Sequence, residues 1–158
     1  MGQSFEVKRL RSEDVEQMEE LNALFGDVFE DPDSYHAHPP QRAYLERWLA
    51  KDHVFALVAC DGAGQITGGL VAYELEKFEQ RRSEVYIYDL AVREHARRRG
   101  VATELIEALR GLARARGAWV VFVQADHGDD PAIALYTKLG VREDVLHFDI
   151  PVNGGEPR

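Results

Sequence analysis

The stretch that decides the fold runs from Tyr86 to Thr103 and reads YIYDLAVREHARRRGVAT. Its first part belongs to a run rich in aromatic and β-branched residues, which predicts a strand over 84–92. From Gly100 the apolar residues recur at helical spacing, which predicts a helix over 100–116 that Gly117 ends. A strand that turns into a helix presents backbone N–H groups at the helix start, where the helix dipole favours anions.

Three consecutive arginines, Arg97, Arg98 and Arg99, precede Gly100 in this turn. Their charge, and the lack of a side chain on glycine, suit a pyrophosphate that approaches the backbone closely. The same residues also fit a solvated surface run beside an ordinary turn glycine, so the residues by themselves leave both interpretations open. A triphosphate-binding P-loop and a Rossmann fingerprint do not fit, because their glycine spacings are missing here.

Upstream of this stretch the sequence predicts two helices and three strands. Ser12 can cap the first helix, and Gly26 is expected to end it. The last two upstream strands flank a turn with two glycines, which predicts an antiparallel hairpin. In order, we expect a strand, a helix, a loop, a helix and two hairpin strands at 6–10, 12–26, 31–40, 41–50, 53–60 and 66–75.

Downstream, the run 118–124 is almost entirely apolar, which is typical of a strand covered on both faces, so we expect it to lie centrally in the sheet. Asp130 followed by Pro131 is a strong helix-start signal with Asp130 as the cap, and this helix is expected to reach about Leu139. A last strand over 141–150 and a polar tail at about 151–158 complete the chain.

Composition and charge limit the function classes. With 158 residues, 45% of them apolar, the chain can fill one core, so we expect a single domain over 1–158. A formal charge of −9 argues against nucleic acid as a partner and slightly favours a cationic one. No stretch reaches the roughly 18 to 20 apolar residues of a membrane span, and the start of the chain is unlike a signal peptide. We therefore expect a cytoplasmic protein with no membrane partner.

Thiol and metal chemistry have little support in the sequence. Cys60 is the one cysteine, and its apolar strand makes it a small core residue rather than a nucleophile. His36 and His38 fall in an expected loop, and their spacing alone is poor support for a metal site. We expect no metal.

The order of the deciding stretch resembles the acetyl-CoA pyrophosphate loop of the GNAT superfamily, in which an Arg-x-x-Gly-x-Ala turn follows a strand. Arg97, Gly100 and Ala102 occupy the three defining positions. The resemblance implies an α/β fold with a mixed, mostly antiparallel sheet, flanked by helices and splayed open near Val92 to admit acetyl-CoA. It implies that the cofactor-binding residues are Leu90, Ala91, Val92, Arg97, Arg98, Arg99, Gly100, Val101, Ala102 and Thr103.

The segment 134–141, which reads ALYTKLGV, resembles the second cofactor motif of the same superfamily. A tyrosine of that motif stands near the CoA sulfur, which makes Tyr136 the candidate acid. A tyrosine in an amphipathic helix also fits a core position, and without the preceding loop that interpretation would be preferred.

Further runs resemble the gentamicin 3-N-acetyltransferase family, from about Phe25 to Ile150. They are 77–80, 82–84, 86–92, 124–126, 128–132 and 147–150. The resemblance implies transfer of acetyl from acetyl-CoA to the 3-amino group of a 2-deoxystreptamine antibiotic, which is a cationic aminoglycoside, and it makes a homodimer reasonable. His127 departs from the family, where another aromatic residue is expected, and this difference can alter the fit of the substrate.

Asp89 is the first candidate for the base that deprotonates or orients the amine, directly or through water. Tyr136 is the candidate for the acid that protonates the departing sulfur. The expected substrate-binding residues are Glu84, Tyr88, Asp89, Asp126 and Asp129. Two of these positions also have structural interpretations, because Asp129 can be solvated and Glu84 can mark a strand end. The neighbouring Asp130 can act only as a helix cap. A polyamine or a protein N-terminus as acceptor, and a CoA-binding sensor without turnover, stay open.

Overall fold

The computed structural model describes residues 4–156 of the 158-residue chain. The chain divides into two compact units, residues 1–124 and residues 125–158, and each is described by itself. The single domain expected over 1–158 stays a prediction.

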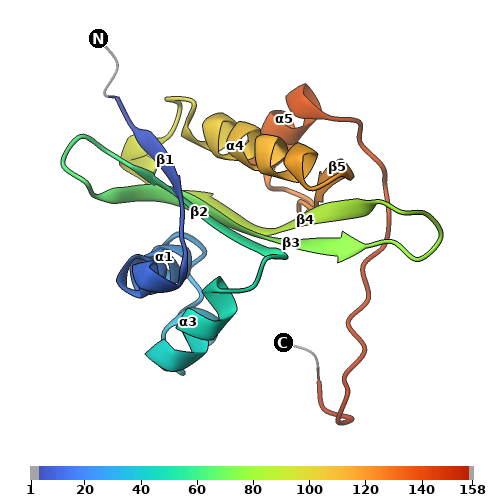
Figure 1. Ribbon diagram of the computed structural model, residues 1–158, viewed down its shortest axis with the longest axis horizontal. Helices are drawn as coiled ribbons and strands as arrows, with labels where there is room; N and C mark the ends of the chain where they lie inside the picture. The colour runs from blue at the N-terminus through green and yellow to red at the C-terminus, as the bar shows by residue number, and fades with distance from the viewer. Residues whose placement is uncertain (1–3, 157–158) are drawn as a thin grey trace. The chain divides into compact units, whose positions relative to one another are not determined.

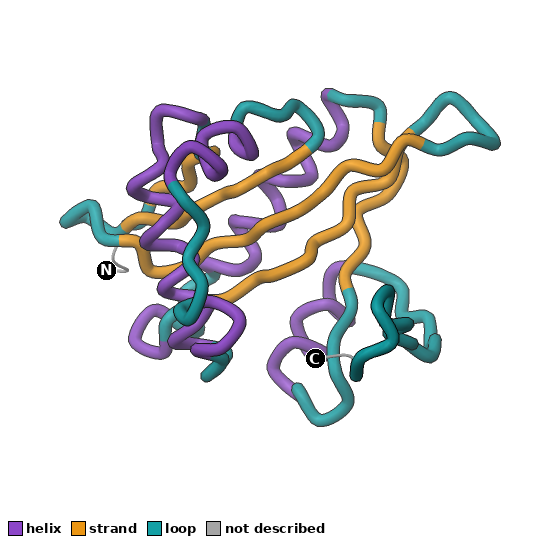
Figure 2. The backbone as a smooth tube through the Cα atoms, turned by 90° about the horizontal axis from the view of Figure 1, so that it is seen from below, coloured by secondary structure: helices purple, strands orange, loops and turns teal. Residues whose placement is uncertain are grey.

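A five-stranded sheet forms the frame of the first unit, and its strands follow one another in chain order (Figure 2). The strands are β1 (Glu6–Arg9), β2 (Val54–Cys60), β3 (Ile66–Glu76), β4 (Ser83–Val92) and β5 (Ala118–Val123). The first four pair antiparallel, whereas β4 and β5 pair parallel. The parallel pair is possible because a crossover helix lies between the two strands in the chain.

Helices cover both faces of this sheet (Figure 1). The elements before β2 are η1 (Ser12–Asp14), α1 (Val15–Val28), α2 (Pro32–Tyr35) and α3 (Arg42–Leu49), and those between β4 and β5 are η2 (Glu94–Ala96) and α4 (Val101–Ala115). Buried residues of α1 and α3 pack with Ala56, Val58 and Val71 on one face. The alternating strand residues Phe55 and Leu57 are also fully buried, and they point to the face that α4 covers.

The start and end expected for the first helix are wrong. Ser12 belongs to the short η1, and the Asp14 carboxylate accepts a hydrogen bond from the backbone N–H of Arg11 at 2.9 Å. Gly26 lies inside α1, where a Cβ atom would collide with the His36 ring. This glycine therefore permits a close approach of the following loop and does not stop the helix.

The central position expected for 118–124 is also wrong. β5 is the edge strand of the sheet, and its side chains are half-buried or exposed. A continuous apolar run indicates that neither face is strongly polar, but it does not report how many neighbours the strand has.

The second unit contains α5 (Asp130–Leu139), and Asp129 rather than Asp130 caps it by accepting a hydrogen bond from the Ala132 N–H at 3.3 Å. The strand expected over 141–150 is wrong, because these residues form no regular secondary structure. Their apolar side chains are exposed, among them Leu146, Phe148 and Ile150. An extended segment becomes a strand only when a neighbouring strand accepts its hydrogen bonds, so an apolar pattern alone does not make one.

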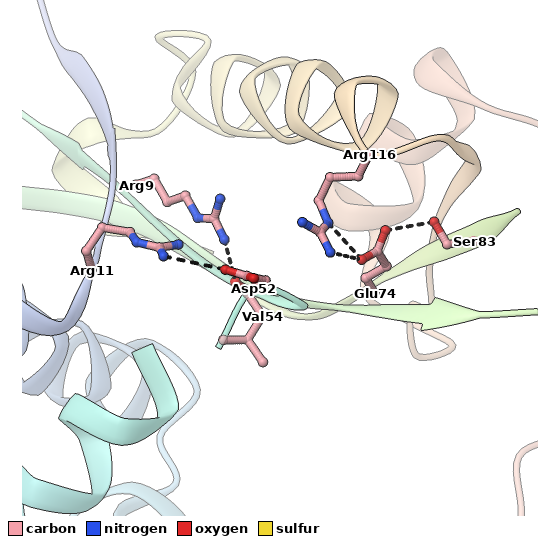
Figure 3. Close-up of polar contacts among 7 residues, drawn as sticks. All are labelled: Arg9, Arg11, Asp52, Val54, Glu74, Ser83 and Arg116. Atoms are coloured by element: carbon pink, nitrogen blue, oxygen red, sulfur yellow. Dashed lines mark hydrogen bonds and ion pairs between the residues drawn. The ribbon is translucent and has the colours of Figure 1, made fainter. Parts of the chain in front are cut away.

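A buried acidic side chain joins β3, β4 and the end of α4 (Figure 3). Glu74 is 8% exposed and accepts a hydrogen bond from the Ser83 hydroxyl at 2.8 Å. The Nε and Nη2 atoms of Arg116 bind the same Glu74 oxygen at 2.8 and 2.7 Å. Because a buried carboxylate is costly unless it is paired and hydrogen-bonded, these contacts are what make Glu74 tolerable there.

Candidate active site

A β-bulge in β4 decides where Asp89 points. Asp89 pairs with Val71 of β3, and Ile87 pairs with the next β3 residue, Ala72, so Tyr88 is an extra residue with no partner in the ladder. In an unbroken strand, Ile87 and Asp89 would share a face. The bulge turns Ile87 toward the α4 face and Asp89 toward the face of α1 and α3, because cross-strand partners share a face.

Asp89 is a half-buried carboxylate with a single short hydrogen bond. The Tyr35 hydroxyl donates to its Oδ2 atom at 2.6 Å. Burial raises the pKa of Asp89 above its ordinary value, and the Tyr35 hydrogen bond opposes that rise. A carboxylate with a raised pKa is a better proton acceptor than a solvated one, which suits a general base.

Tyr35 reaches this position because residues 31–40, expected to be a loop, contain the one-turn helix α2. The Asp31 carboxylate caps this turn by accepting a hydrogen bond from the Ser34 N–H, and Pro32 occupies its first turn. The Tyr35 ring packs against Phe25 and Phe29 at centroid distances of 6.0 and 5.9 Å. Sequence reasoning missed Tyr35, although Asp31 followed by Pro32 carried the same helix-start signal that was recognised at 130–131.

Aromatic rings continue across the sheet beside Asp89. Three successive pairs of rings pack edge to face, with centroid distances of 5.9 to 6.0 Å. The pairs are Trp48–Tyr73, Tyr73–Tyr88 and Tyr88–Tyr86. The Tyr86 ring then stacks on Phe122 of β5 at 4.7 Å. Tyr88, an expected substrate-binding residue, is 62% exposed and therefore offers its ring to a bound molecule.

The sheet opens between β4 and β5. β5 pairs with β4 only from Ser83 to Ile87, whereas β4 continues to Val92 with β3 as its neighbour. Leu90, Ala91 and Val92 thus lie on a strand edge that the described part of β5 leaves uncovered. The backbone groups of such an edge can pair with the amide groups of an extended ligand, and the cofactor-binding role that the resemblance implies for these residues stays a prediction.

Not all of the arginines expected in the anion-binding turn point outward. Arg93 forms an ion pair with Asp27 at 3.4 Å. The Nε of Arg97 donates to the Val92 carbonyl at 3.0 Å, so this side chain closes the turn. Arg98 has a φ of 62°, which reverses the chain just before the helix.

Gly100 precedes α4 with a φ of 79°, and a Cβ atom built there would meet nothing within 4 Å. Only glycine adopts this conformation without strain. The N–H groups of the first turn of α4, from Val101 onward, have no carbonyl of the helix to bind. A surface hollow of about 440 Å³ lies beside this turn, and its lining consists of Phe5 and Val7 at β1 together with Arg99, Gly100, Thr103 and the acidic Glu104. The turn therefore offers anion-binding amides beside open space.

Two glycines of β3 that sequence reasoning did not single out support this region. A Cβ atom on Gly68 would lie 3.1 Å from the Ala91 carbonyl oxygen and 3.2 Å from Val101. On Gly69 it would collide with the Leu21 side chain. Two consecutive glycines inside an apolar strand pattern indicate close packing, and this signal could have identified both positions from the sequence.

Some expected site residues are not brought to Asp89. Glu84 lies five residues earlier on β4, roughly 16 Å away along the strand, and its carboxylate lies 3.7 Å from Lys77. Asp126, Asp129 and Tyr136 belong to the second unit, so their role beside Asp89 stays a prediction. Burial, with the nearby Asp129 charge, raises the pKa of Tyr136.

Residues 17–141 match the Acetyltransferase (GNAT) family. The chain belongs to this family. The GNAT fold predicted from the deciding stretch is thereby confirmed, with its mixed sheet and flanking helices. The family uses acetyl-CoA, and the uncovered edge 90–92 and the turn at Gly100 fit such a molecule.

Solved GNAT structures of high similarity include aminoglycoside acetyltransferases. One from an uncultured soil metagenomic sample is 57% identical, covers 94% of this chain and 99% of its own, and has a TM-score of 0.92. Another from such a sample, in complex with sisomicin, is 31% identical with a TM-score of 0.86, covering 94% of this chain and 96% of its own. An N-alpha-acetyltransferase of Sulfurisphaera tokodaii is 25% identical over 153 residues, covering 90% of this chain and 83% of its own. This GNAT protein is therefore an acetyl-transferring enzyme.

Two further findings bear on partners. Within residues 4–156, no group of three or more His, Cys, Asp or Glu side chains lies where it could hold a metal ion. None of the helices in this part of the chain has the length and apolar character needed to cross a membrane.

Proposed function

We propose that this enzyme is an aminoglycoside 3-N-acetyltransferase, which transfers acetyl from acetyl-CoA to the 3-amino group of a 2-deoxystreptamine antibiotic such as gentamicin and so confers resistance. The observation that carries the proposal is the 57% identity, over 94% of the chain, to a solved aminoglycoside acetyltransferase. The position of the transferred acetyl rests on the resemblance of 77–92 and 124–150 to the gentamicin 3-N-acetyltransferases.

Asp89 has the properties that the amine side of this reaction requires. An ammonium group must lose a proton before its nitrogen can attack, and a half-buried carboxylate with a raised pKa can accept that proton directly or through one water. When bound, acetyl-CoA supplies an acetyl thioester whose carbonyl carbon is open to attack. The edge 90–92 would hold its extended arm, and the amides at 100–103 would hold its pyrophosphate.

Tyr136 is the proposed acid for the thiol side. Like an ordinary tyrosine, it is protonated at neutral pH, and burial, which raises its pKa, keeps it in that state, so the hydroxyl carries a proton for the departing sulfur. Tyr136→Phe keeps the ring and removes this proton, and turnover at saturating substrate should therefore fall with little change in affinity for acetyl-CoA. Wild-type turnover in this variant would assign Tyr136 to packing.

The acceptor is proposed to bind through carboxylates and aromatic rings. Asp89 carries negative charge beside the exposed Tyr88 ring, and cations bind favourably over aromatic faces. Asp126 and Asp129 are the further carboxylates that we propose for the remaining ammonium groups, although Asp129 also caps α5. A rigid polycation can meet several such groups with a smaller loss of conformational entropy than a flexible polyamine.

Side-by-side assays with gentamicin, kanamycin and spermidine test the proposal. We expect CoA release with gentamicin at a kcat/KM at least tenfold above that with spermidine, and product NMR should find the acetyl on the 3-amino group. Acetyl on another amine would refute the regiochemistry alone. No turnover of any 2-deoxystreptamine antibiotic would refute the assignment, and acetyl-CoA binding without CoA release with any amine would favour a sensor.

The N-terminus of a protein is the second candidate acceptor, and the 25% identity to an N-alpha-acetyltransferase favours it. Short peptides with a free α-amino group belong in the same assay as gentamicin. Faster acetylation of a peptide than of any aminoglycoside would support this second function over the first.

A further inference from the structure

The hydrogen bond between Tyr35 and Asp89 joins two segments that are far apart in the chain. Tyr35 belongs to the one-turn helix α2, and Asp89 lies 54 residues later, just after the bulge of β4. Within residues 4–156, the Tyr35 hydroxyl is the one hydrogen-bond donor to this carboxylate, and it binds Oδ2. The Oδ1 atom accepts no hydrogen bond from a residue in this range.

Within residues 4–156, burial raises the pKa of Asp89, the Tyr35 hydrogen bond lowers it, and no arginine, lysine or histidine contributes. Burial raises the pKa of Tyr73 of β3 and of Tyr86 of β4, and the Asp89 charge adds to that rise. Tyr88 and Asp31 act on Tyr35 itself and raise the pKa of its hydroxyl further. The neighbours are therefore neutral phenols and one carboxylate, so Tyr35 is what favours the charged form of Asp89.

Contacts with α1 and the residue that follows it also fix the position of Tyr35. Its ring contacts Phe25 and Phe29 of α1 and its C-terminal flank, and α2 is tied to α1 by the hydrogen bond from the Asp31 N–H to the Gly26 carbonyl at 3.1 Å. A hydroxyl on a ring packed in this way has little freedom to leave Asp89, so the carboxylate orientation follows from the packing of α1 and α2.

We propose that Tyr35 is a positioning residue of the acetyl transfer: its hydroxyl holds the Asp89 carboxylate in the orientation and charge state in which Oδ1 accepts the proton of the acceptor amine. The inference rests on the proposed role of Asp89 as the base. It adds a residue from outside the cofactor motifs, and it gives the segment between α1 and α3 a part in catalysis.

Tyr35→Phe tests the inference, because it removes the hydroxyl and keeps the ring. With gentamicin as the probe, kcat should fall about ten- to a hundredfold, which is the loss expected for a hydrogen bond to a charged group, while KM changes less than threefold. The pKa of Asp89 should rise, so the ascending limb of the pH–rate profile should move to higher pH. In an Asp89→Asn background, Tyr35→Phe should cause almost no further loss.

Two variants separate positioning from packing. Tyr44→Phe removes a hydroxyl from a tyrosine of α3 that is 52% exposed, and both kcat and the ascending limb of the pH–rate profile should stay those of the wild type. Tyr35→Leu removes the ring together with the hydroxyl. A loss of kcat in Tyr35→Leu with wild-type kcat in Tyr35→Phe would mean that packing of the ring explains the effect, and would overturn the inference.

Direct titration of the Asp89 carboxyl carbon by ¹³C NMR, in wild type and Tyr35→Phe, gives a readout that needs no acceptor. A higher apparent pKa in the variant supports the inference, and identical titration curves overturn it whatever amine the enzyme acetylates. Wild-type turnover in Asp89→Asn would instead remove Asp89 as the base, and with it the proposed mechanism.

Discussion

At the residue scale, Asp89 combines partial burial with a neutral hydrogen-bond donor, and these act on its pKa in opposite directions. An arginine in the place of Tyr35 would lower the pKa of the carboxyl strongly and make it a poor base. A phenol orients the carboxylate without adding a charge. Asp89 therefore retains its basicity because Tyr35, its hydrogen-bond partner within residues 4–156, is neutral.

Asp89→Asn should lower kcat with gentamicin at least a hundredfold and remove the ascending limb of the pH–rate profile. The same substitution should not lower the stability of the fold, although it lowers activity. Because the pKa of Asp89 is higher in the folded than in the unfolded protein, its contribution to stability is greatest at low pH and is lost as pH rises through the folded value. Asparagine has no charge to bury, so thermal unfolding at pH 7 should occur at the same or a higher temperature. A near-normal pH–rate profile would transfer the base role to another group.

At the element scale, the turn into α4 depends on one glycine conformation. Gly100 and Gly117 stand at the two ends of the helix with φ values of 79° and 82°, and neither has an atom within 4 Å of a Cβ position. An aspartate at either site should cost about 1 to 2 kcal/mol of folding stability through backbone strain. Of these two aspartates, only the one at position 100 would face the proposed pyrophosphate site.

Gly100→Asp should therefore weaken acetyl-CoA binding at least tenfold in calorimetry, because a carboxylate would stand where backbone amides face an anion. Gly117→Asp is the matched control, since it introduces the same backbone strain and the same charge at the far end of α4. The affinity of this variant for acetyl-CoA should be that of the wild type. Equal affinities in two folded variants would remove the pyrophosphate role of this turn.

The Glu74 network is the element-scale contact that ties β4 to the end of α4. Glu74→Ala should lower the free energy of unfolding by about 2 to 4 kcal/mol, because it removes a buried carboxylate and leaves Ser83 and Arg116 without their acceptor. Glu107→Ala breaks an ion pair of 2.7 Å between half-exposed side chains and should cost less than about 0.5 kcal/mol. Urea unfolding of both variants gives the comparison, and similar losses would contradict a structural role for Glu74.

At the scale of the whole molecule, the second unit does not form a core of its own. Every described residue from Ala125 to Glu156 is half-buried or exposed, and apolar side chains from Val141 to Val152 lie open to solvent. A segment of this size rarely folds alone, since it buries too little apolar surface to offset its conformational entropy.

The family resemblance predicts a homodimer, and sedimentation equilibrium tests it. At micromolar concentration we expect a particle of twice the chain mass of 17.9 kDa. Dilution to the nanomolar range in the presence and absence of acetyl-CoA would show whether the association depends on the cofactor. A single species of 17.9 kDa throughout would contradict the dimer.

Much of the architecture could be predicted because it depends on local periodicity. The strands at 54–60, 66–76 and 83–92 and the helices at 42–49, 101–115 and 130–139 lie within one or two residues of their expected bounds. The errors concern features that depend on partners. The residues next to Gly26 in the chain do not indicate its contact with His36, which lies ten residues away. The apolar pattern of 141–150 does not indicate whether a neighbouring strand is present to pair with it.

The sequence by itself indicated the family and most of the order of the elements, and it predicts an anion-binding turn, because these features depend on contiguous residues: a strand, three arginines, Gly100 and an apolar period. Only the tertiary structure decided which groups surround Asp89. The bulge at Tyr88 reverses the face on which Asp89 lies, and Tyr35 reaches it from 54 residues away. Side-chain direction in a strand follows the register with its neighbour, and a contact between distant segments follows from packing. Neither has a local signature in the chain.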